Sequence, residues 1–365
     1  MKIVLVSFGL TDYCIPLANG LAERASVTYV YGHKGSPVDF SSLSPKVTLQ
    51  QYAEPRLRQL TSQIKCMLRL ARDIRARAPD VVHLQHAHPW FNLIALPLLK
   101  RFPVVCTIHD VLPHPGDKLS AKTPFWTQRV GYRQASQVIV HGHSLKALAA
   151  ARLKISATRI NCVPMIANVT VPLTTAQGAS QSAKGTKDIL FFGRIFEYKG
   201  LRYLIEAEPL ITARVPEARI VIAGTGDDLE KYQRQMVHPG QFVVHNHFIS
   251  NQEMSTLFNE AEVVALPYIE ASQSGVVPVA YRFGKAVVAS RVGGLPDFVD
   301  DGQTGLLVPP RDTHALAAAL VRLLMDDSLR RQMGHKGRMK MEAECSPRAV
   351  AALTLDVYRK AIAAG

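Results

Sequence analysis

Two cations follow one predicted strand at a spacing that suits a diphosphate. Residues 189–192 form an apolar run that ends at Gly193 and Arg194, and Lys199 follows five residues later. Glycine lets the backbone turn tightly, and open α/β sheets bind ligands at the carboxyl ends of their strands. A guanidinium beside an ammonium can neutralise clustered phosphate oxygens. The pattern predicts phosphate binding by Arg194 and Lys199, although two solvated cations in an ordinary loop would have the same spacing.

Further apolar runs follow in an order that builds a parallel sheet. Helical patterns separate most of them, and this alternation is typical of a doubly wound α/β domain. The predicted strands of the C-terminal half lie in residues 218–226, 261–268, 284–290 and 302–308. The N-terminal half alternates in the same way, with strands predicted in residues 1–7, 26–31, 81–83, 104–109 and 137–140.

The C-terminal half resembles the donor domain of the retaining GT-B glycosyltransferases of glycosyltransferase family 4. The family pattern is a Gly-Arg pair, a Lys-Gly pair, a glycine-rich turn, an acidic loop and three further glycine-containing segments. The corresponding residues are 193–194, 199–200, 224–226, 270–275, 284–290, 293–296 and 302–308, a match over about 120 residues. Family members use this Arg and Lys to bind the diphosphate of a nucleotide sugar, which assigns that role to Arg194 and Lys199.

The resemblance implies the GT-B fold, in which two Rossmann-like doubly wound parallel-sheet domains face a cleft. We expect an acceptor-binding domain in residues 1–173 and a donor domain in residues 189–345. The segment 174–188 is rich in Ser and lacks an apolar period, so it is predicted to be the linker. The C-terminal helix, 346–365, begins with Ser346 and Pro347 and is expected to pack back on the N-terminal domain.

The activity implied by the resemblance is retaining sugar transfer from a nucleotide-diphosphate sugar to a hydroxyl. The acceptor would be a glycan, glycolipid or lipid-linked molecule in cell-surface polysaccharide or glycoconjugate synthesis. The resemblance implies same-face attack with charge stabilisation at the diphosphate, and the sequence offers no clear nucleophile with a paired base. The chain contains no Asp-x-Asp, and neither a metal nor a cofactor beyond the co-substrate is expected. The carboxylate pairs at 227–228 and 300–301 leave metal binding open.

The donor loop departs from the family pattern of two glutamates separated by seven residues. Alignment on Gly284 puts Val279 at the second glutamate, which contacts ribose in the family, and Glu270 near the first, which contacts the transferred sugar. One interpretation keeps activity, with serine, glutamine and backbone amides opening a helix that holds phosphate. The alternative is an unusual donor or a catalytically degenerate protein that binds glycan or lipid. The predicted donor-binding residues are Gly9, Gly193, Arg194, Lys199, Gly224, Gly226, Phe248, Ser272, Gln273, Ser274, Gly275 and Val276.

His109 and Asp110 end the fourth predicted strand of the N-terminal domain. A histidine there can hydrogen-bond a sugar, and an adjacent carboxylate can position it or the acceptor hydroxyl. Family members carry a similar His-Asp element, whereas a strand-end histidine that caps the backbone is the plain alternative. The predicted catalytic residues are His109, Asp110, Arg194, Lys199 and Glu270, and the predicted acceptor-binding residues are Asp12, His86, His88 and His114. His83 resembles a structural position of the family.

Charge is concentrated in the N-terminal half. Residues 1–175 hold 21 Lys and Arg against 8 Asp and Glu, whereas residues 176–365 hold 22 against 21. The segment 54–80 carries seven cations among apolar residues spaced by three and four, which predicts an amphipathic basic helix. This helix could rest on anionic lipid, at about 1 kcal/mol per cation, or could cover a sheet with a solvated basic face. Nucleic acid is not expected, because the chain lacks its binding motifs.

The remaining features of the sequence concern the cellular compartment and the alternative classes of enzyme. Five scattered cysteines lack metal-like spacing, so reduced thiols and no zinc are expected. The chain starts on a predicted strand, and its longest apolar stretch is well below the roughly 20 residues of a membrane helix, so we expect a cytoplasmic or peripheral protein. A nicotinamide-dependent dehydrogenase would need glycine where residue 229 is Leu. A nucleotide-sugar epimerase or a phosphorylase of GT-B shape stays open.

Overall fold

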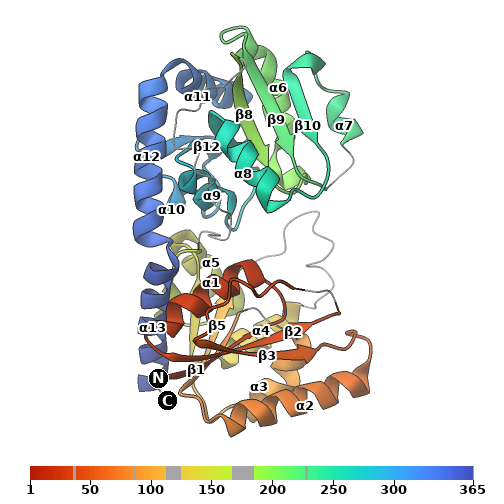
Figure 1. Cartoon of the computed structure of the whole chain (residues 1–365), viewed down its shortest axis with the longest axis vertical. Coiled ribbons are helices and arrows are strands. Elements are labelled where there is room, and N and C mark those ends of the chain that lie inside the picture. Colours follow the sequence, from red (N-terminus) through yellow and green to blue (C-terminus); the bar gives the residue numbers. More distant parts are fainter. Residues whose placement is uncertain (36–37, 86–87, 112–124, 167–184, 227–228, 365) are drawn as a thin grey trace. The chain divides into compact units, whose positions relative to one another are not determined.

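The computed structural model describes residues 1–35, 38–85, 88–111, 125–166, 185–226 and 229–364 (Figure 1). These residues divide into two compact units. Of the described residues, 1–111, 125–166 and 344–364 belong to unit 1, and those between 185 and 343 belong to unit 2. The predicted linker lies mostly outside the described residues and stays a prediction.

Each unit is built on a parallel sheet. Within the described residues, the sheet of unit 1 has seven strands in the order β3-β2-β1-β4-β5-β6-β7, and that of unit 2 has six in the order β10-β9-β8-β11-β12-β13. In both sheets the order reverses at the first strand, β1 or β8. The predicted α/β class with two doubly wound parallel sheets is confirmed. Ligands of such sheets bind at the carboxyl ends of the strands beside the reversal.

Unit 1 contains the strands and helices that the N-terminal half predicts, together with two strands that it does not. The missed strands are β3 and β7, and the final helix of the chain, α13, also belongs to this unit. The elements are β1 (Lys2–Ser7), α1 (Thr11–Ala22), β2 (Ser26–His33), β3 (Val47–Ala53), α2 (Leu60–Ala76), β4 (Val81–Leu84), a π-helix (Phe91–Ala95), α3 (Leu96–Leu98), β5 (Val104–Ile108), α4 (Phe125–Gln134), β6 (Gln137–Val140), α5 (His143–Leu153), β7 (Ile160–Cys162) and α13 (Pro347–Ala363).

Unit 2 contains the four predicted strands and the first apolar run, and it adds β10, which the sequence analysis missed. The four strands predicted from residue 218 onward are shorter than their predicted ranges, whereas β8 begins two residues before the predicted run. The elements are β8 (Lys187–Phe192), α6 (Leu201–Thr212), β9 (Ala218–Ala223), α7 (Glu230–Gln233), β10 (Phe242–His245), α8 (Asn251–Glu260), β11 (Val263–Leu266), α9 (Val276–Arg282), β12 (Ala286–Ser290), α10 (Leu295–Phe298), β13 (Gly305–Val308), α11 (Thr313–Met325) and α12 (Asp327–Glu344).

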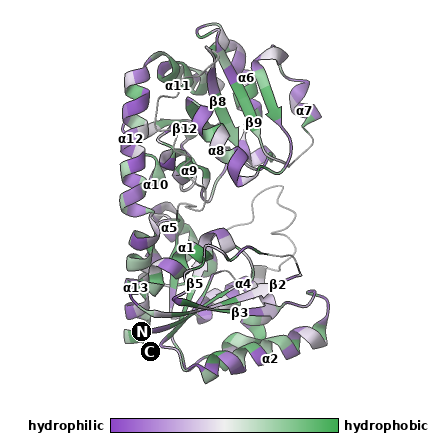
Figure 2. Cartoon of the chain, in the orientation of Figure 1, coloured by the Kyte–Doolittle hydropathy of each residue, from purple (hydrophilic) through white to green (hydrophobic). Residues whose placement is uncertain are grey.

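Both faces of each sheet are covered, so the central strands are apolar along their length. In unit 1, α1 and α13 cover one face and α2 and α5 cover the other. In unit 2, α6 and α11 pack on one face with β8, β9 and β12. Figure 2 shows β8 and β9 mostly in the hydrophobic colour, whereas the helices carry mixed colours. This is the pattern that parallel strands buried on both faces require.

Helix α13 is capped and fastened by specific polar contacts. As predicted, Ser346 is its N-cap, with Oγ accepting a hydrogen bond from the Ala349 N–H at 3.3 Å. Tyr358 on this helix has its hydroxyl 2.6 Å from Nδ1 of His83, a buried histidine of β4. The other ring nitrogen of His83 lies 2.8 Å from Thr107 Oγ1. Both ring nitrogens of His83 are therefore committed to holding α13 and β5 on β4.

Helix α2 buries only part of the predicted apolar stripe. The spacing by three and four assigns Leu60, Leu68, Ala71 and Ile74 to one face; Ala71 and Ile74 are buried, whereas Leu60 and Leu68 are 52% and 46% exposed. The buried stripe also includes Gln63 and Met67. Both sets have helical spacing, and contact with β3 and the π-helix selects the second. Two leucines therefore lie exposed among the cations of this helix.

None of the helices in the described part of the chain combines the length and the apolar character that a membrane crossing requires. All five cysteines carry free thiols, and Cys14, Cys106 and Cys345 are buried. This agrees with the prediction of reduced, mostly packed cysteines.

Candidate functional site

Glycines bring the loops after β8 and β9 into backbone contact. Gly193 has a φ of 113°, and a Cβ on Gly224 would overlap the Gly193 carbonyl group. In the same way, a Cβ on Gly226 would overlap the carbonyl group of Ile195. Only glycine permits this approach. Arg194, which is exposed, therefore leaves the sheet beside the glycine turn that follows β9.

Lys199 is held by aromatic rings on the other side of β8. Its Nζ lies 3.8 Å from the ring centroid of Tyr268, which follows β11, and 5.3 Å from that of Tyr198. The next residue, Gly200, has a φ of 68°, and a Cβ there would overlap the Pro267 carbonyl group. This contact presses the turn after β8 against the end of β11, where the strand order reverses. A cation over an aromatic face is stabilised by the ring quadrupole.

Arg194 shares an aromatic partner with Lys199. Its Nη2 donates to the hydroxyl of Tyr198 at 3.3 Å, and its guanidinium lies 5.3 Å from the ring centroid of Phe196. The two predicted phosphate-binding cations thus meet at Tyr198. The structure brings Arg194 and Lys199 together as the sequence spacing suggested, and it adds the rings that orient them.

The loop after β11 is folded around Ser274. Its Oγ lies 3.0 Å from the Tyr268 hydroxyl and accepts from the Val276 N–H at 3.3 Å. Burial raises the pKa of Tyr268 well above its usual range, so this hydroxyl stays protonated. The side-chain amide of Gln273 has both its nitrogen and its oxygen buried without a hydrogen-bond partner among the described residues. Gln273 therefore has polar groups available to a ligand.

Other predicted donor residues occupy different environments. Ser272 is buried, Gly275 is the N-cap of α9, and Glu270 is exposed after β11. Val279 lies inside α9 with only 7% exposure. Because an apolar side chain is buried at this position, the helix offers no polar group there.

A pocket of about 570 Å³ adjoins the glycine turn after β9. Thr225 and Gly226 form one wall, while Glu230 and Gln233 of α7 line it together with Asn246 after β10. Asn246 therefore brings the segment that follows β10 to the pocket. Phe248 is 88% exposed and does not line it. The sequence analysis missed Glu230 and Gln233, because α7 was not assigned.

In unit 1, two histidines form a hydrogen-bonded chain at the ends of β5 and β6. His141 Nδ1 lies 3.0 Å from the Val163 carbonyl oxygen, and its Nε2 lies 3.1 Å from Nδ1 of His109. A carbonyl oxygen can only accept, so His141 carries its proton on Nδ1 and accepts at Nε2. His109 in turn donates from Nδ1, and in the neutral ring its Nε2 becomes an acceptor. The chain fixes the tautomer of His109.

Burial keeps His141 neutral. It lowers the pKa of His141 to about 4, partly opposed by the hydrogen bond to the Val163 carbonyl and by the charge of Asp110. Tyr13 of α1 packs edge-on against both rings, with centroid distances of 5.1 Å to His109 and 5.3 Å to His141. Asp110 itself is exposed. The sequence analysis missed His141, although it directly follows a predicted strand.

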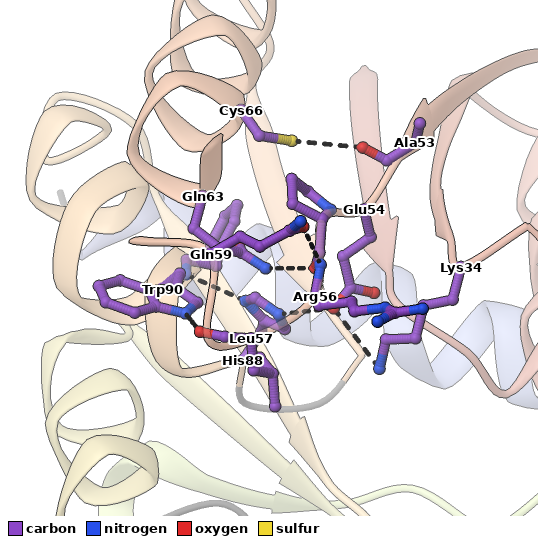
Figure 3. Close-up of polar contacts among 12 residues, drawn as sticks. Lys34, Ala53, Glu54, Arg56, Leu57, Gln59, Gln63, Cys66, His88 and Trp90 are labelled. Carbon is purple, nitrogen blue, oxygen red and sulfur yellow. Dashed lines mark hydrogen bonds and ion pairs between the residues drawn. The ribbon is translucent and has the colours of Figure 1, made fainter. Parts of the chain in front are cut away.

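A second polar cluster lies at the ends of β3 and β4 (Figure 3). Glu54 is buried, with its Oε1 3.2 Å from His88 Nε2 and 3.5 Å from the Nζ of the exposed Lys34. The Phe91 N–H donates to His88 Nδ1 at 3.2 Å, so this ring carries its proton on Nε2 and donates to Glu54. Phe8 stacks on His88 with a centroid distance of 4.2 Å. His88 is thus fully engaged.

Gly9, predicted to bind the donor, and Asp12, predicted to bind the acceptor, lie in the turn after β1 and at the start of α1. Gly9 has a φ of 150°, and Ser7 Oγ donates to its carbonyl at 2.7 Å, which shapes the turn after β1. Asp12 is exposed in the first turn of α1. His86 and His114 lie outside the described residues. Lys34 and Glu54 were missed. Lys34 directly follows β2, a predicted strand, whereas β3, which Glu54 follows, was not predicted.

Two family models match the chain. "Glycosyltransferase Family 4" matches residues 9–169, and "Glycosyl transferases group 1" matches residues 186–326. The chain is 35% identical over 149 residues to the phosphatidyl-myo-inositol mannosyltransferase of Mycolicibacterium smegmatis, a match that covers 40% of this chain and 38% of that protein. It is 26% identical over 307 residues to the alpha-D-kanosaminyltransferase of Streptomyces kanamyceticus, covering 80% and 79%.

Solved structures share the whole fold. Sucrose-phosphate synthase from Thermosynechococcus elongatus superposes with a TM-score of 0.75 at 20% identity, covering all of both chains. Anabaena Alr3699/HepE, in complex with UDP and glucose, gives a TM-score of 0.75 at 16% identity and covers 98% of both chains. At these identities the likeness establishes the fold alone.

The buried histidines predict that unit 1 loses stability in acid. Burial lowers the pKa of His83 to about 3 and that of His141 to about 4, whereas an unfolded histidine titrates near 6.5. Above pH 6.5 both states are neutral and this stability is fully present. As pH falls towards 4, only the unfolded chain gains protons, so each histidine should reduce the free energy of unfolding by on the order of 2 kcal/mol at pH 5.

The measurement is urea unfolding at several pH values, followed by tryptophan fluorescence. Both tryptophans, Trp90 and Trp126, belong to unit 1, so the signal reports this unit. A His141→Gln variant should show a shallower pH dependence, whereas substitution of the exposed His335 in unit 2 should leave it unchanged. Equal unfolding free energies at pH 7.5 and 5 in the unmodified protein would contradict the expectation.

Proposed function

We propose that this chain, a GT-B glycosyltransferase built from a family 4 domain and a group 1 domain, moves a sugar from a nucleoside diphosphate to an acceptor hydroxyl with retention of configuration. Donor binding is assigned to the unit 2 segment 189–345, and acceptor binding to the unit 1 segment 1–173. The observation that carries the proposal is the convergence of Arg194 and Lys199 on Tyr198 beside the strand-order reversal at β8.

The diphosphate is proposed to lie on these two cations, with the base in the pocket lined by Thr225, Gln233 and Asn246. Similar structures contain UDP or UDP-glucose, which makes a uracil nucleotide the first to test. The buried amide of Gln273 is the candidate contact for the sugar or ribose hydroxyls, since Val279 cannot hydrogen-bond them. Glu270, exposed beside the same loop, is the candidate contact for the transferred sugar.

The proposed step breaks the bond between the anomeric carbon and the diphosphate oxygen, and the acceptor oxygen bonds to the same face. Negative charge then accumulates on the leaving diphosphate, where Arg194 and Lys199 neutralise it. Their positions are set beforehand by Tyr198 and Tyr268, so little reorganisation accompanies the reaction. The acceptor proton can pass to the departing phosphate oxygen, which balances the reaction without a metal ion.

His109 is proposed to position a substrate hydroxyl. The His141 hydrogen bond leaves the His109 Nε2 as an acceptor, and an acceptor nitrogen at a strand end suits a sugar hydroxyl. Asp110, exposed next to it, is the candidate contact for a second hydroxyl. His88 and Glu54 form part of the acceptor side as positioning groups, because both ring nitrogens of His88 are already engaged.

The acceptor is proposed to be lipid-linked, with α2 resting on an anionic membrane. Arg69 and Arg72 have side chains 71% and 76% exposed, and Lys65 is exposed on the same helix. Leu60 and Leu68 are exposed among these cations. Each cation near an anionic surface contributes about 1 kcal/mol, and apolar side chains add burial in the interface.

The first prediction of the proposed function concerns Arg194 and Lys199. Arg194→Ala and Lys199→Ala should each lower kcat/KM about 10²- to 10³-fold, since a preorganised donor is worth roughly 3–4 kcal/mol in the transition state. Nucleotide release in the presence of an acceptor panel measures the rate, and thermal shifts with UDP, GDP and ADP measure binding. Arg202→Ala, an exposed arginine on α6, is the matched control. Wild-type rates in both variants would remove the donor assignment, whereas binding without turnover would favour a degenerate binding protein.

The second prediction concerns His109. His109→Ala should lower kcat about 10²- to 10³-fold while the nucleotide affinity stays unchanged, because the nucleotide is assigned to unit 2. His141→Gln should give a smaller loss, since it disturbs only the tautomer and orientation of His109. An His109→Ala enzyme with unchanged turnover would return this residue to a structural role.

The third prediction concerns the membrane. The protein should sediment with phosphatidylglycerol vesicles but not with phosphatidylcholine vesicles, and salt should release it. Lys65→Glu/Arg69→Glu/Arg72→Glu should abolish sedimentation. The same three charge reversals on exposed Arg331, Lys336 and Arg338 of α12 are the control for net charge. Equal losses in the two triple variants would contradict a specific role of α2.

A further inference from the structure

His245, His247 and Glu253 gather where β10 ends and α8 begins. His245 is the last residue of β10, and His247 follows two positions later. Glu253 is the third residue of α8. Its Oε1 lies 3.3 Å from His245 Nδ1 and 2.8 Å from His247 Nε2, and its Oε2 lies 3.0 Å from the same His247 nitrogen. One carboxylate therefore meets two imidazoles.

The helix start holds Glu253 in place for these contacts. Ser250 is the N-cap of α8, and its Oγ accepts from the Glu253 N–H at 3.2 Å. A serine followed three residues later by glutamate is the sequence of a capping box, in which the carboxylate reaches back to the N-cap N–H. In this chain the Glu253 carboxylate lies against two ring nitrogens. The cap therefore fixes the backbone of Glu253, and the carboxylate oxygens contact the two histidines.

The donor set and its spacing suit a transition metal. Two imidazole nitrogens with one carboxylate oxygen are a common zinc ligand set that leaves one position open. Ligands at about 2.0–2.1 Å around a tetrahedral ion lie about 3.3 Å from one another. The contacts to Glu253 span 2.8–3.3 Å, and the three ligand atoms all lie within 4.8 Å of one another. Small side-chain rotations would admit an ion.

We propose that His245, His247 and Glu253 bind a divalent transition metal, with zinc preferred. His247 and Glu253 are 54% and 28% exposed, so solvent reaches the site and supplies the fourth ligand. The sequence analysis missed this site, because it searched for metals through cysteine spacing and paired aspartates.

The metal would stiffen one wall of the nucleotide pocket. Asn246, which lines the 570 Å³ pocket, lies between the two histidine ligands in the sequence. The Gly224 N–H donates to the His245 carbonyl at 3.0 Å, which ties the same segment to the glycine turn after β9. This consequence rests on the proposed nucleotide site, whereas the metal site itself does not. A bound ion should therefore raise the affinity for the nucleotide without taking part in sugar transfer.

The test uses full-length, tag-free protein treated with a chelator and then dialysed. Titration with Zn²⁺ against a chromophoric chelator should show one saturable equivalent. His247→Ala and Glu253→Gln should each weaken binding at least tenfold, and the second keeps the shape of the side chain so that the fold is retained. Circular dichroism checks the fold of both variants.

His238→Ala is the matched control. His238 is also 54% exposed and also pairs with a glutamate, with Nδ1 3.0 Å from Glu208 Oε1, but it belongs to no three-ligand group among the described residues. This variant should bind Zn²⁺ as the unmodified protein does. No saturable binding, or equal binding by the His247→Ala protein, would overturn the metal site.

A separate measurement distinguishes the metal site from its effect on the nucleotide. Thermal shifts with UDP are recorded with and without one equivalent of Zn²⁺. A larger UDP shift with zinc, lost in His247→Ala, is the expected result. Zinc binding without any UDP shift would leave the metal site standing and would count against the nucleotide assignment and the coupling.

Discussion

The site of unit 2 depends on backbone contacts that only glycine allows. Side chains at Gly200, Gly224 and Gly293 would each overlap a carbonyl group of a neighbouring loop. Through these contacts the turns after β8, β9, β11 and β12 form one layer along the carboxyl edge of the sheet. The strand order places β8 beside β11 at the reversal, so this layer is continuous at the turn that carries Arg194 and Lys199. The position of the two cations therefore depends on how closely these turns approach one another.

Unit 1 uses histidines in a different way. His83 and His141 are buried, and burial lowers the pKa of both rings. His83 lies between the hydroxyls of Tyr358 and Thr107, each of which can donate or accept, whereas the Val163 carbonyl fixes the tautomer of His141. His83 fastens α13 to β4, and His141 sets the tautomer of His109. A charged ring in either position would lose its hydration in a low-dielectric interior, and at His141 the charge of Asp110 offsets only part of this cost. His141 also leaves the buried Nε2 of His109 as the acceptor of that ring.

The sequence predicted the architecture well because its signals are local. Apolar runs ending in glycine marked most strands, and Ser346 with Pro347 marked the last helix. The strands β3 and β10 were missed, and with them Glu54 and the cluster around His245, since these residues become neighbours only through strand pairing. The exposed leucines of α2 were misassigned because two stripes have the same spacing and tertiary packing selects one. Tyr268 lies some 70 residues from Lys199 in the sequence, so no spacing rule could pair them.

The distribution of charge suits the two halves of the chain to different kinds of anion. The half of the chain that contains unit 2 is nearly neutral, with 22 Lys and Arg against 21 Asp and Glu, so its net field cannot hold a diphosphate. Many of these cations are paired with carboxylates, as Arg219 is with Asp188 at 2.7 Å. Arg194 and Lys199 lie against aromatic rings, which orient a cation without neutralising it. The half that contains unit 1 carries its excess of 13 positive charges partly on the exposed face of α2. A dispersed field of that kind attracts an extended surface, whereas two fixed cations recognise a small group whose charge changes during a reaction.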